Sequence, residues 1–553
     1  MRRPPQPADL RLLPPVLAGW AATWLGLSMP PGTTAVLATT IALLGMAGMV
    51  HAQRRVAAHP AAPEPWASAL CTMLLVAAGL ALSAAVHVAT ASSGPVPGLA
   101  AQSAFVGTAL TVTGDPRRVA STQPGRSAAP NRSPDTGGPS ARKPTVSQLV
   151  LLPVRITQVT TGTGLRYETG TSATVLVRPR SPADFDAWMV LLPSEHLRLS
   201  GRLEPPRGGT SDGAVLLARG RPNVVGGPST IQSVAGTLRA DLRDAASTLP
   251  AEEAGFLPAV AVGDTSREPT ELNDALKRSG LAYITVASGE NLVFAATALL
   301  PVARWAGLRG RAVTGSAVVV VLGFTLLARP GPPMVRATVM SLLGCAASVS
   351  GRRVRALTTM SAAALVLLLI DPWLAHSYGF ALSAAATAGL LIVAPGWCDR
   401  LLDRGVPLWI AGPAAATAAA ELFCEPVLVL FSGTLPLIAV PANILAVPAA
   451  PVATVLGIGA MAADAVWPPL GHAVAWVAQW PVRWICLVAR DAAAVPGAAV
   501  GWPTGIGGCA LLLGCYVAGW RLLGRRRNRS RAVNGDSAPQ TRTGLDKAGL
   551  VSI

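Results

Sequence analysis

Residues 263–294 read GDTSREPTELNDALKRSGLAYITVASGENLVF, and here a charged surface segment runs directly into a membrane-length apolar one. In the first half, apolar residues such as Leu272 and Leu276 recur at helical spacing, which predicts a short amphipathic helix. Gly280 predicts the end of that helix, because glycine tolerates the left-handed conformation found there. The chain is then almost wholly apolar from Leu281 to Leu300.

Four residues interrupt this apolar run: Ser288, Gly289, Glu290 and Asn291. A carboxylate and an amide are costly in hydrocarbon, so such groups usually face a protein interior or water. We therefore predict that these four residues line a pathway through the membrane domain.

The composition is that of a membrane protein. Of the 553 residues, 51% are hydrophobic and 13% are charged, and the mean hydropathy is +0.46. Apolar runs of about 20 residues recur, which is the length that crosses a bilayer as a helix. We expect a polytopic α-helical membrane protein with about twelve transmembrane helices and a small external all-β domain.

Arginines follow every second predicted span, so the positive-inside rule predicts a multi-pass protein of the cell membrane with both termini cytoplasmic. No cleavable signal peptide is evident, and the first apolar run is interpreted as a signal anchor. The predicted spans are 12–29, 33–50, 68–89, 283–303, 313–328, 334–349, 356–370, 379–394, 407–423, 427–461, 471–489 and 502–522.

The segment 427–461 is too long for one crossing and contains four prolines. Proline breaks helices, and irregular backbone at membrane depth is tolerated where it is buried in protein or lines a wet cavity. We interpret the segment as a broken or re-entrant element beside a pathway. The alternative is one ordinary kinked helix with a long loop.

Between the third and fourth spans lies the one large polar region. Residues 114–144 are rich in Pro, Ser, Gly and Arg and are expected to be disordered. Short β-type runs then follow, and they fit a small barrel such as an OB-fold without being specific to it. The predicted strands are 149–159, 173–177, 188–192, 197–203 and 214–218.

The excess of basic residues in this polar region has two interpretations. The whole chain has a net charge of +17, and residues 92–239 hold 16 Lys or Arg against 8 Asp or Glu, a net +8. Long translocated loops are largely exempt from the positive-inside rule, so topology does not explain the local excess. It indicates either contact with nucleic-acid phosphates or a solvated or lipid-facing surface.

No catalytic or metal-binding cluster is recognisable, and we predict a protein that is not an enzyme and needs no cofactor. The seven cysteines form no CxxC pair, so their spacing predicts neither a zinc site nor a disulfide framework.

The opening stretch resembles the element that begins the competence domain of the ComEC/Rec2 family. The match lies in Gly263 and Asp264, which begin the GDTS element, the amphipathic helix, and the later Ser288-Gly289-Glu290-Asn291. The family often has His where Tyr283 stands and a small residue where Glu290 stands. Three further elements follow in the family's order: PPMVRATVM at 332–340, DPW with GFALS at 371–383, and PANILAVP at 441–448. They contribute Arg336, Asp371, Pro372, Gly379, Phe380, Ser383, Asn443 and Pro448.

Members of this family are proposed DNA-uptake channels of naturally transformable bacteria. The resemblance implies a channel or permease for single-stranded DNA, with membrane lipid, a helix-hairpin-helix DNA receptor and a cytoplasmic helicase as further partners. Many members end in a metallo-β-lactamase domain, a proposed nuclease. Its HxHxDH-type cluster is absent from this sequence, so any nuclease is expected to be a separate protein. The predicted domains are N-terminal transmembrane helices (1–91), a disordered external linker (92–145), an external OB-like domain (146–240), an amphipathic connector (241–282), a competence-type transmembrane channel domain (283–522) and a cytoplasmic basic tail (523–553).

Two residues of the predicted pathway have structural alternatives. Arg336 lies near the outer end of its span and either attracts phosphates or extends to the interface as a snorkelling side chain. Asn443 lies between two prolines and either lines a pore or satisfies backbone groups that the prolines leave free. Two other functions also stay open: a transporter of a small solute or lipid, and a non-transporting scaffold that binds a partner through the external domain.

Overall fold

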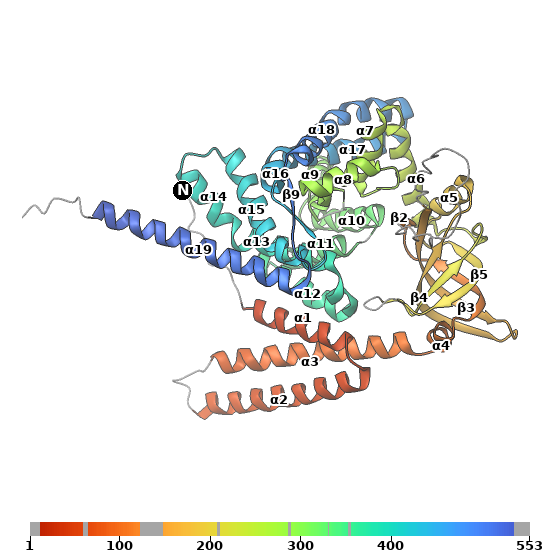
Figure 1. Cartoon of the computed structure of the whole chain (residues 1–553), viewed down its shortest axis with the longest axis horizontal. Coiled ribbons are helices and arrows are strands. Elements are labelled where there is room, and N and C mark those ends of the chain that lie inside the picture. Colours follow the sequence, from red (N-terminus) through yellow and green to blue (C-terminus); the bar gives the residue numbers. More distant parts are fainter. Residues whose placement is uncertain are drawn as a thin grey trace, which may run out of the picture. The chain divides into compact units, whose positions relative to one another are not determined.

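The computed structural model describes residues 11–58, 65–121, 147–206, 211–285, 289–329, 331–351 and 355–535. The chain divides into two compact units, and each is described by itself. The first consists of Met1–Cys424 and Pro436–Ala499, and the second of Glu425–Leu435 and Val500–Ile553. The first unit contains a sheet domain and most of the apolar helices (Figure 1).

Five strands of the sheet domain close into a barrel. Each strand pairs with the next in the order β1-β3-β4-β6-β5, and β5 pairs back to β1. All these pairs are antiparallel except β4 with β6, which is parallel. The strands are β1 (Phe105–Val112), β3 (Ser147–Thr161), β4 (Arg166–Val177), β5 (His196–Glu204) and β6 (Ala214–Ala218), with β2 (Arg117–Ser121) added to β3 and β7 (Val224–Gly226) to β5.

The barrel has its own core because its strands alternate between buried and more exposed residues. In β5 the buried positions fall at every second residue, which directs one face of the strand inward. The core includes Val106, Leu110, Val150, Leu152, Ile156, Val175, Leu197, Leu203 and Leu216. Two helices accompany the barrel, α4 (Pro95–Ala101) and α5 (Pro182–Met189).

Two expectations for this domain are wrong. The predicted linker 92–145 contains α4, β1 and β2, and β1 is one of the five barrel strands. The part of it after β2, residues 122–145, lies outside the described residues. The predicted strand 188–192 begins inside α5, because the Ser181 hydroxyl accepts a hydrogen bond from the backbone N–H of Asp184 and caps a helix that starts at Pro182.

The connector 241–282 begins within α6 and continues through buried helices. It contains the predicted amphipathic helix, confirmed as α8 (Thr270–Ser279), which buries Leu272 and Leu276 and ends at Gly280 with a φ of 74°. The connector elements are α6 (Thr230–Ala245), η1 (Ala246–Thr248), α7 (Ala251–Val262), α8 and η2 (Ala282–Ile284).

The apolar helices agree with a membrane protein. By length and composition, four described segments can cross a bilayer: Pro31–Arg54, Ala67–Ser92, Arg311–Ala328 and Ala439–Asp464. A helix pair bent by 42°, Tyr378–Ile392 with Ala394–Asp403, can form a fifth, and four shorter apolar helices are Leu13–Leu27, Asn291–Trp305, Ala356–Ile370 and Gly505–Gly519. The helices before and after the connector are α1 (Leu13–Leu27), α2 (Pro31–Ala58), α3 (Pro65–Ser92), α9 (Gly289–Trp305), α10 (Arg311–Ala328), α11 (Pro332–Val349), α12 (Ala356–Ile370), η3 (Pro372–His376), α13 (Tyr378–Ile392), α14 (Ala394–Asp403) and α15 (Leu408–Leu428).

The proline-rich segment 427–461 is less broken than expected. Residues after α15 form a loop with β8 (Thr434–Pro436), and α16 (Ala439–Ala446), η4 (Val447–Ala449) and α17 (Ala450–Asp464) then follow without a gap. Pro448 lies in the 3-10 turn η4, where one tightened turn joins the two helices. The backbone of 439–464 is therefore one kinked helix preceded by a loop rather than a broken helix, which leaves the side from which it enters the membrane open.

The helix α17 packs in one core with the connector. Gly457 allows this close approach, because an added Cβ atom there would lie 2.6 Å from the Ala261 Cβ atom of α7. The helix α18 (Pro468–Ala494) contributes to the same core. Residues buried in it include Leu242, Phe256, Leu257, Leu272, Leu276, Met461, Val482 and Ile485.

The second unit is small. Val429, Leu435 and Leu512 form its core, and Tyr516 donates a hydrogen bond from its hydroxyl to Glu425. Its elements include α19 (Gly505–Gly535), and β8 pairs with β9 (Ala499–Gly501).

Candidate functional site

Two of the sequence motifs meet at Arg336. This residue of α11 is 6% exposed, and its guanidinium group donates from Nε and Nη2 to the Ser383 hydroxyl of α13 at 3.0 and 2.8 Å. Nη1 lies 2.9 Å from the Met340 sulfur, one turn further along α11. Within the described residues no carboxylate forms an ion pair with Arg336. In the described part of the chain, the side-chain contacts of Arg336 are therefore with neutral acceptors, a hydroxyl and a thioether.

The N-terminus of α9 packs closely on α11 beside this cation. An added Cβ atom at Gly289 would lie 2.6 Å from the Ala337 Cβ atom and 4.0 Å from Arg336 Nη2. A larger residue at position 289 would therefore push the two helices apart. Ser288 and the side chain of Glu290 lie outside the described residues.

Asn291 contacts the connector. Its side chain is 6% exposed and donates from Nδ2 to the carbonyl oxygen of Val260, in the last turn of α7, at 3.0 Å. Carbonyl groups in the last turn of a helix have no partner within that helix. Asn291 therefore joins α9 to α7 as a structural hydrogen bond.

Asn443 lies at the centre of a second polar cluster. Its side chain is fully buried and accepts a hydrogen bond from the Tyr283 hydroxyl at 2.6 Å. It donates from Nδ2 to the Ala439 carbonyl at 2.9 Å and lies 3.5 Å from Glu421 Oε1. These contacts join η2, α16 and α15, so each hydrogen-bonding group of this amide has a protein partner.

The GDTS motif forms a buried ion network. Asp264 is 3% exposed and lies 3.4 Å from the Arg239 guanidinium and 3.1 Å from that of Arg243, both on α6. Arg239 also lies 3.3 Å from Asp115, in the loop after β1, and Asp115 pairs with Arg329 at 2.9 Å. The network therefore ties the barrel to the connector and to the loop after α10.

Asp264 is ionised in this network. Burial would raise the pKa of its carboxyl group, but Arg239, the hydrogen bond from Ser266 and Arg243 together hold the pKa below its usual value. Gly263 precedes it with a φ of 71° and ends α7. The glycine is required because a left-handed residue here turns the chain so that Asp264 faces α6.

The remaining motif residues have local structural contacts. Asp371 accepts a hydrogen bond from the Trp373 N–H and caps η3, which begins at Pro372. Phe380 is fully buried, with its ring centroid 4.9 Å from that of Trp20 on α1. Gly379 lies in the first turn of α13, and Pro448 is exposed in η4.

The structure thus divides the predicted pathway residues among separate clusters. Arg336 meets Ser383, whereas Asn291 and Asn443 contact other helices. Reasoning from the sequence missed Glu421, Arg239, Arg243, Arg329 and Asp115. Glu421 is an isolated charged residue within an apolar run. Because such a group requires a partner in the membrane, its position could have indicated a polar contact.

The comparisons with known proteins fit these motifs. A family model described as competence protein matches residues 260–527. ComE operon protein 3 of Bacillus subtilis (strain 168) is 25% identical over 202 residues, which is 36% of this chain and 25% of that protein. No solved structure matches this chain. The chain carries a competence domain at residues 260–527, and this match together with the similarity to ComE operon protein 3 supports a competence protein of the ComEC/Rec2 type.

Proposed function

We propose that this protein is a membrane channel that carries single-stranded DNA across the cell membrane during natural transformation. The observation that carries the proposal is the competence domain at residues 260–527, in which two family motifs meet at a buried cation, Arg336. A phosphate group passing this point would find a guanidinium donor with no carboxylate paired to it in the described part of the chain.

We propose that the barrel is an OB-like domain that contacts DNA, and this role supports the same proposal. An OB-fold is a five-stranded Greek-key barrel that binds oligonucleotides on the face of its second and third strands. The corresponding strands here are β3 and β4, and exposed Arg155 and Arg166 lie on them. Phosphate contacts from such arginines are independent of sequence and release counterions.

The proposed partners are single-stranded DNA, membrane lipid, a helix-hairpin-helix receptor that delivers DNA, a cytoplasmic helicase and a separate nuclease. The role proposed for the chain itself is transport rather than catalysis.

A barrel fragment is expected to bind single-stranded DNA weakly and without sequence preference. A fragment of 145–240 would lack β1, so the fragment must span about 94–228, which holds the whole barrel core. Apparent affinity should fall at least roughly tenfold between 50 and 200 mM salt, because phosphate contacts release counterions. Fluorescence anisotropy measures this, with an Arg155→Ala, Arg166→Ala double variant as the control that weakens it. A fragment that shows no binding at low salt has no DNA-contacting role.

The contact between α6 and the end of α17 constrains the proposed topology. Twelve complete crossings would place the turn after α17 in the cytoplasm and α6 outside, yet Asp244 of α6 lies within 4.8 Å of His472 in α18. We therefore propose that both termini are cytoplasmic, that residues 100–280 are external, and that residues 439–494 enter and leave from the external side.

Cysteine labelling tests this topology. Ser211→Cys and Ala465→Cys are expected to react with an impermeant reagent in intact cells, and Ser537→Cys only after lysis, all in a background with Cys515 replaced by Ser. If Ser211→Cys is labelled and Ala465→Cys is protected, α6 and the end of α17 do not lie on the same side of the membrane. Labelling at 537 in intact cells would overturn the cytoplasmic C-terminus.

Deletion of the gene tests the proposed function. Transformation by purified DNA should be lost and restored by the parent gene, while DNA binding at the cell surface persists. If the deletion strain transforms normally and fails instead to accumulate a small solute, the transporter alternative replaces the DNA channel.

A further inference from the structure

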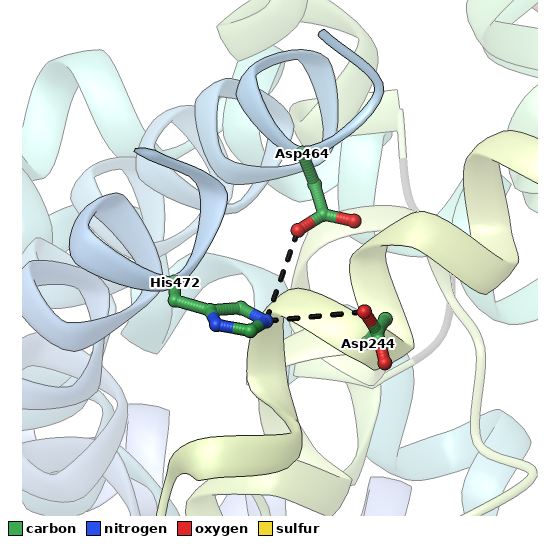
Figure 2. Close-up of side chains that lie close together, drawn as sticks. All are labelled: Asp244, Asp464 and His472. Atoms are coloured by element: carbon green, nitrogen blue, oxygen red, sulfur yellow. Dashed lines mark ion pairs between the residues drawn. The ribbon is translucent and has the colours of Figure 1, made fainter. Parts of the chain in front are cut away.

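Three side chains that are distant in sequence meet beside the connector. Asp244 lies at the end of α6, Asp464 is the last residue of α17, and His472 lies in the first turns of α18. One ligand atom from each lies within 4.8 Å of the other two. Figure 2 shows the His472 ring with Nε2 directed toward both carboxylates, 3.9 Å from Asp244 Oδ2 and 4.0 Å from Asp464 Oδ1.

Asp464 is the residue that requires an explanation. Its side chain is 5% exposed, and its Oδ1 atom, which faces His472, has no hydrogen-bond partner among the described residues. It also ends a helix, where the helix dipole already places partial negative charge. A buried carboxylate in this position is costly unless a cation lies beside it.

Histidine does not fill this role at the observed distances. Its Nε2 atom is buried and also has no hydrogen-bond partner in the described part of the chain. A separation near 4 Å is too long for a hydrogen bond between nitrogen and oxygen. All three ligand atoms lie further apart than or near the roughly 3.4 Å that separates two ligand atoms around a tetrahedral zinc ion, so binding requires the side chains to move inward.

From these contacts we infer that Asp244, Asp464 and His472 form a binding site for a divalent transition-metal ion of the zinc type. One imidazole nitrogen and two carboxylate oxygens are ligands that Zn²⁺ accepts, and two carboxylates balance its charge. Asp244 is the adjustable ligand, because its side chain is 67% exposed. Asp464 is the fixed one: Gly471 packs on it so closely that an added Cβ atom would lie 2.5 Å from Asp464 Oδ1.

The site links two parts of the protein that are separated in sequence. The helix α6 follows directly on the barrel, whereas α17 and α18 lie within the competence domain. A metal ion bound by all three helices holds the connector against the competence domain. Its role here is structural, and it is independent of whether DNA passes through the protein.

Metal content and thermal stability of the full-length protein in detergent test the site. After stripping with chelator and dialysis against Zn²⁺, the parent should retain about one zinc ion per chain, and added Zn²⁺ should raise its Tm. Asp244→Asn should bind Zn²⁺ more than roughly tenfold more weakly, and His472→Ala should lose the metal-dependent rise in Tm.

Two substitutions elsewhere serve as matched controls. Asp274→Asn removes an exposed carboxylate from α8, and His51→Ala removes an exposed histidine from α2, and both should behave as the parent. Asp244 is exposed, so its variant folds even if changes at the buried Asp464 do not. A parent that retains no zinc and shows no zinc-dependent Tm overturns the inference, as does equal zinc binding by the parent and Asp244→Asn.

Discussion

Replacing Arg239 with Met is expected to destabilise the protein by about 3 kcal/mol, because removing one partner of a buried ion pair strands the other. Arg239 is 7% exposed, pairs with Asp264 and Asp115, and donates to the Leu327 carbonyl at 3.0 Å. Among the described residues, Asp264 would keep Arg243 as its one cationic partner. The measurements are the thermal midpoint in detergent and the amount of protein in the membrane.

Arg243→Met is the matched control for this change. Its side chain is 30% exposed, so loss of its ion pair should cost about 1 kcal/mol or less. The double variant Arg239→Met, Asp264→Asn should recover part of the loss, since no carboxylate is stranded at position 264. Equal effects of the Arg239 and Arg243 changes would show that the buried network does not hold the connector.

The same network predicts an acid-sensitive stability. Because the pKa of Asp264 in the folded protein lies below the usual 3.8, its ion pairs stabilise the fold fully above that value. Their contribution is lost as the pH falls through the lower folded pKa. The Asp264→Asn variant should lack this loss, so its thermal midpoint should fall less than that of the parent between pH 5 and pH 3.

Replacing Arg336 with Met is expected to reduce transformation at least roughly tenfold while leaving the protein level unchanged or higher. Among the described residues Arg336 has no carboxylate partner, and a buried unpaired charge is costly, so an apolar residue of similar length should not destabilise α11. The same change removes the donor proposed to meet the DNA phosphates. Arg336→Lys should retain part of the activity, because it keeps the charge and loses the planar fork.

Glu290 allows a second test of the role of Arg336. If it pairs with Arg336, then Arg336→Ala strands a carboxylate, and the double change with Glu290→Ala should restore the protein level. Ser383→Ala is the local control, since it removes the hydroxyl that accepts from Arg336 and leaves the charge in place. If all these variants transform as the parent does at normal protein levels, Arg336 does not lie on the pathway.

Local patterns predicted the parts of this fold that local forces determine. The helix ending at Gly280 and the strand at 214–218 follow from spacing and turn residues. The strand β1 was missed because it lies inside a region judged by its Pro, Ser and Gly content, although FVGTALTV alternates buried and half-buried residues. Its identity as a barrel strand depends on pairing with β5, nearly a hundred residues later.

The polar clusters could not be predicted because their members come from distant segments. Sequence order showed Arg336 and Ser383 in separate motifs, and their 2.8 Å contact depends on how α11 packs on α13. Asp244, Asp464 and His472 are separate in sequence, and no spacing rule joins them. Periodicity reports which face of a helix is buried, but it does not report which helix covers it.

Closure of the barrel sets the order in which this protein can fold. The edge of β1 stays unpaired until Arg202 of β5 emerges to meet Phe105. Contacts between residues so far apart slow folding, because the chain must lose loop entropy before any pair forms. Loop entropy grows only slowly with length, however, so the connection between β2 and β3 can lengthen at small cost. The barrel therefore cannot close before β5 and β6 are both present, and until then one edge of β1 is open to pairing with another chain.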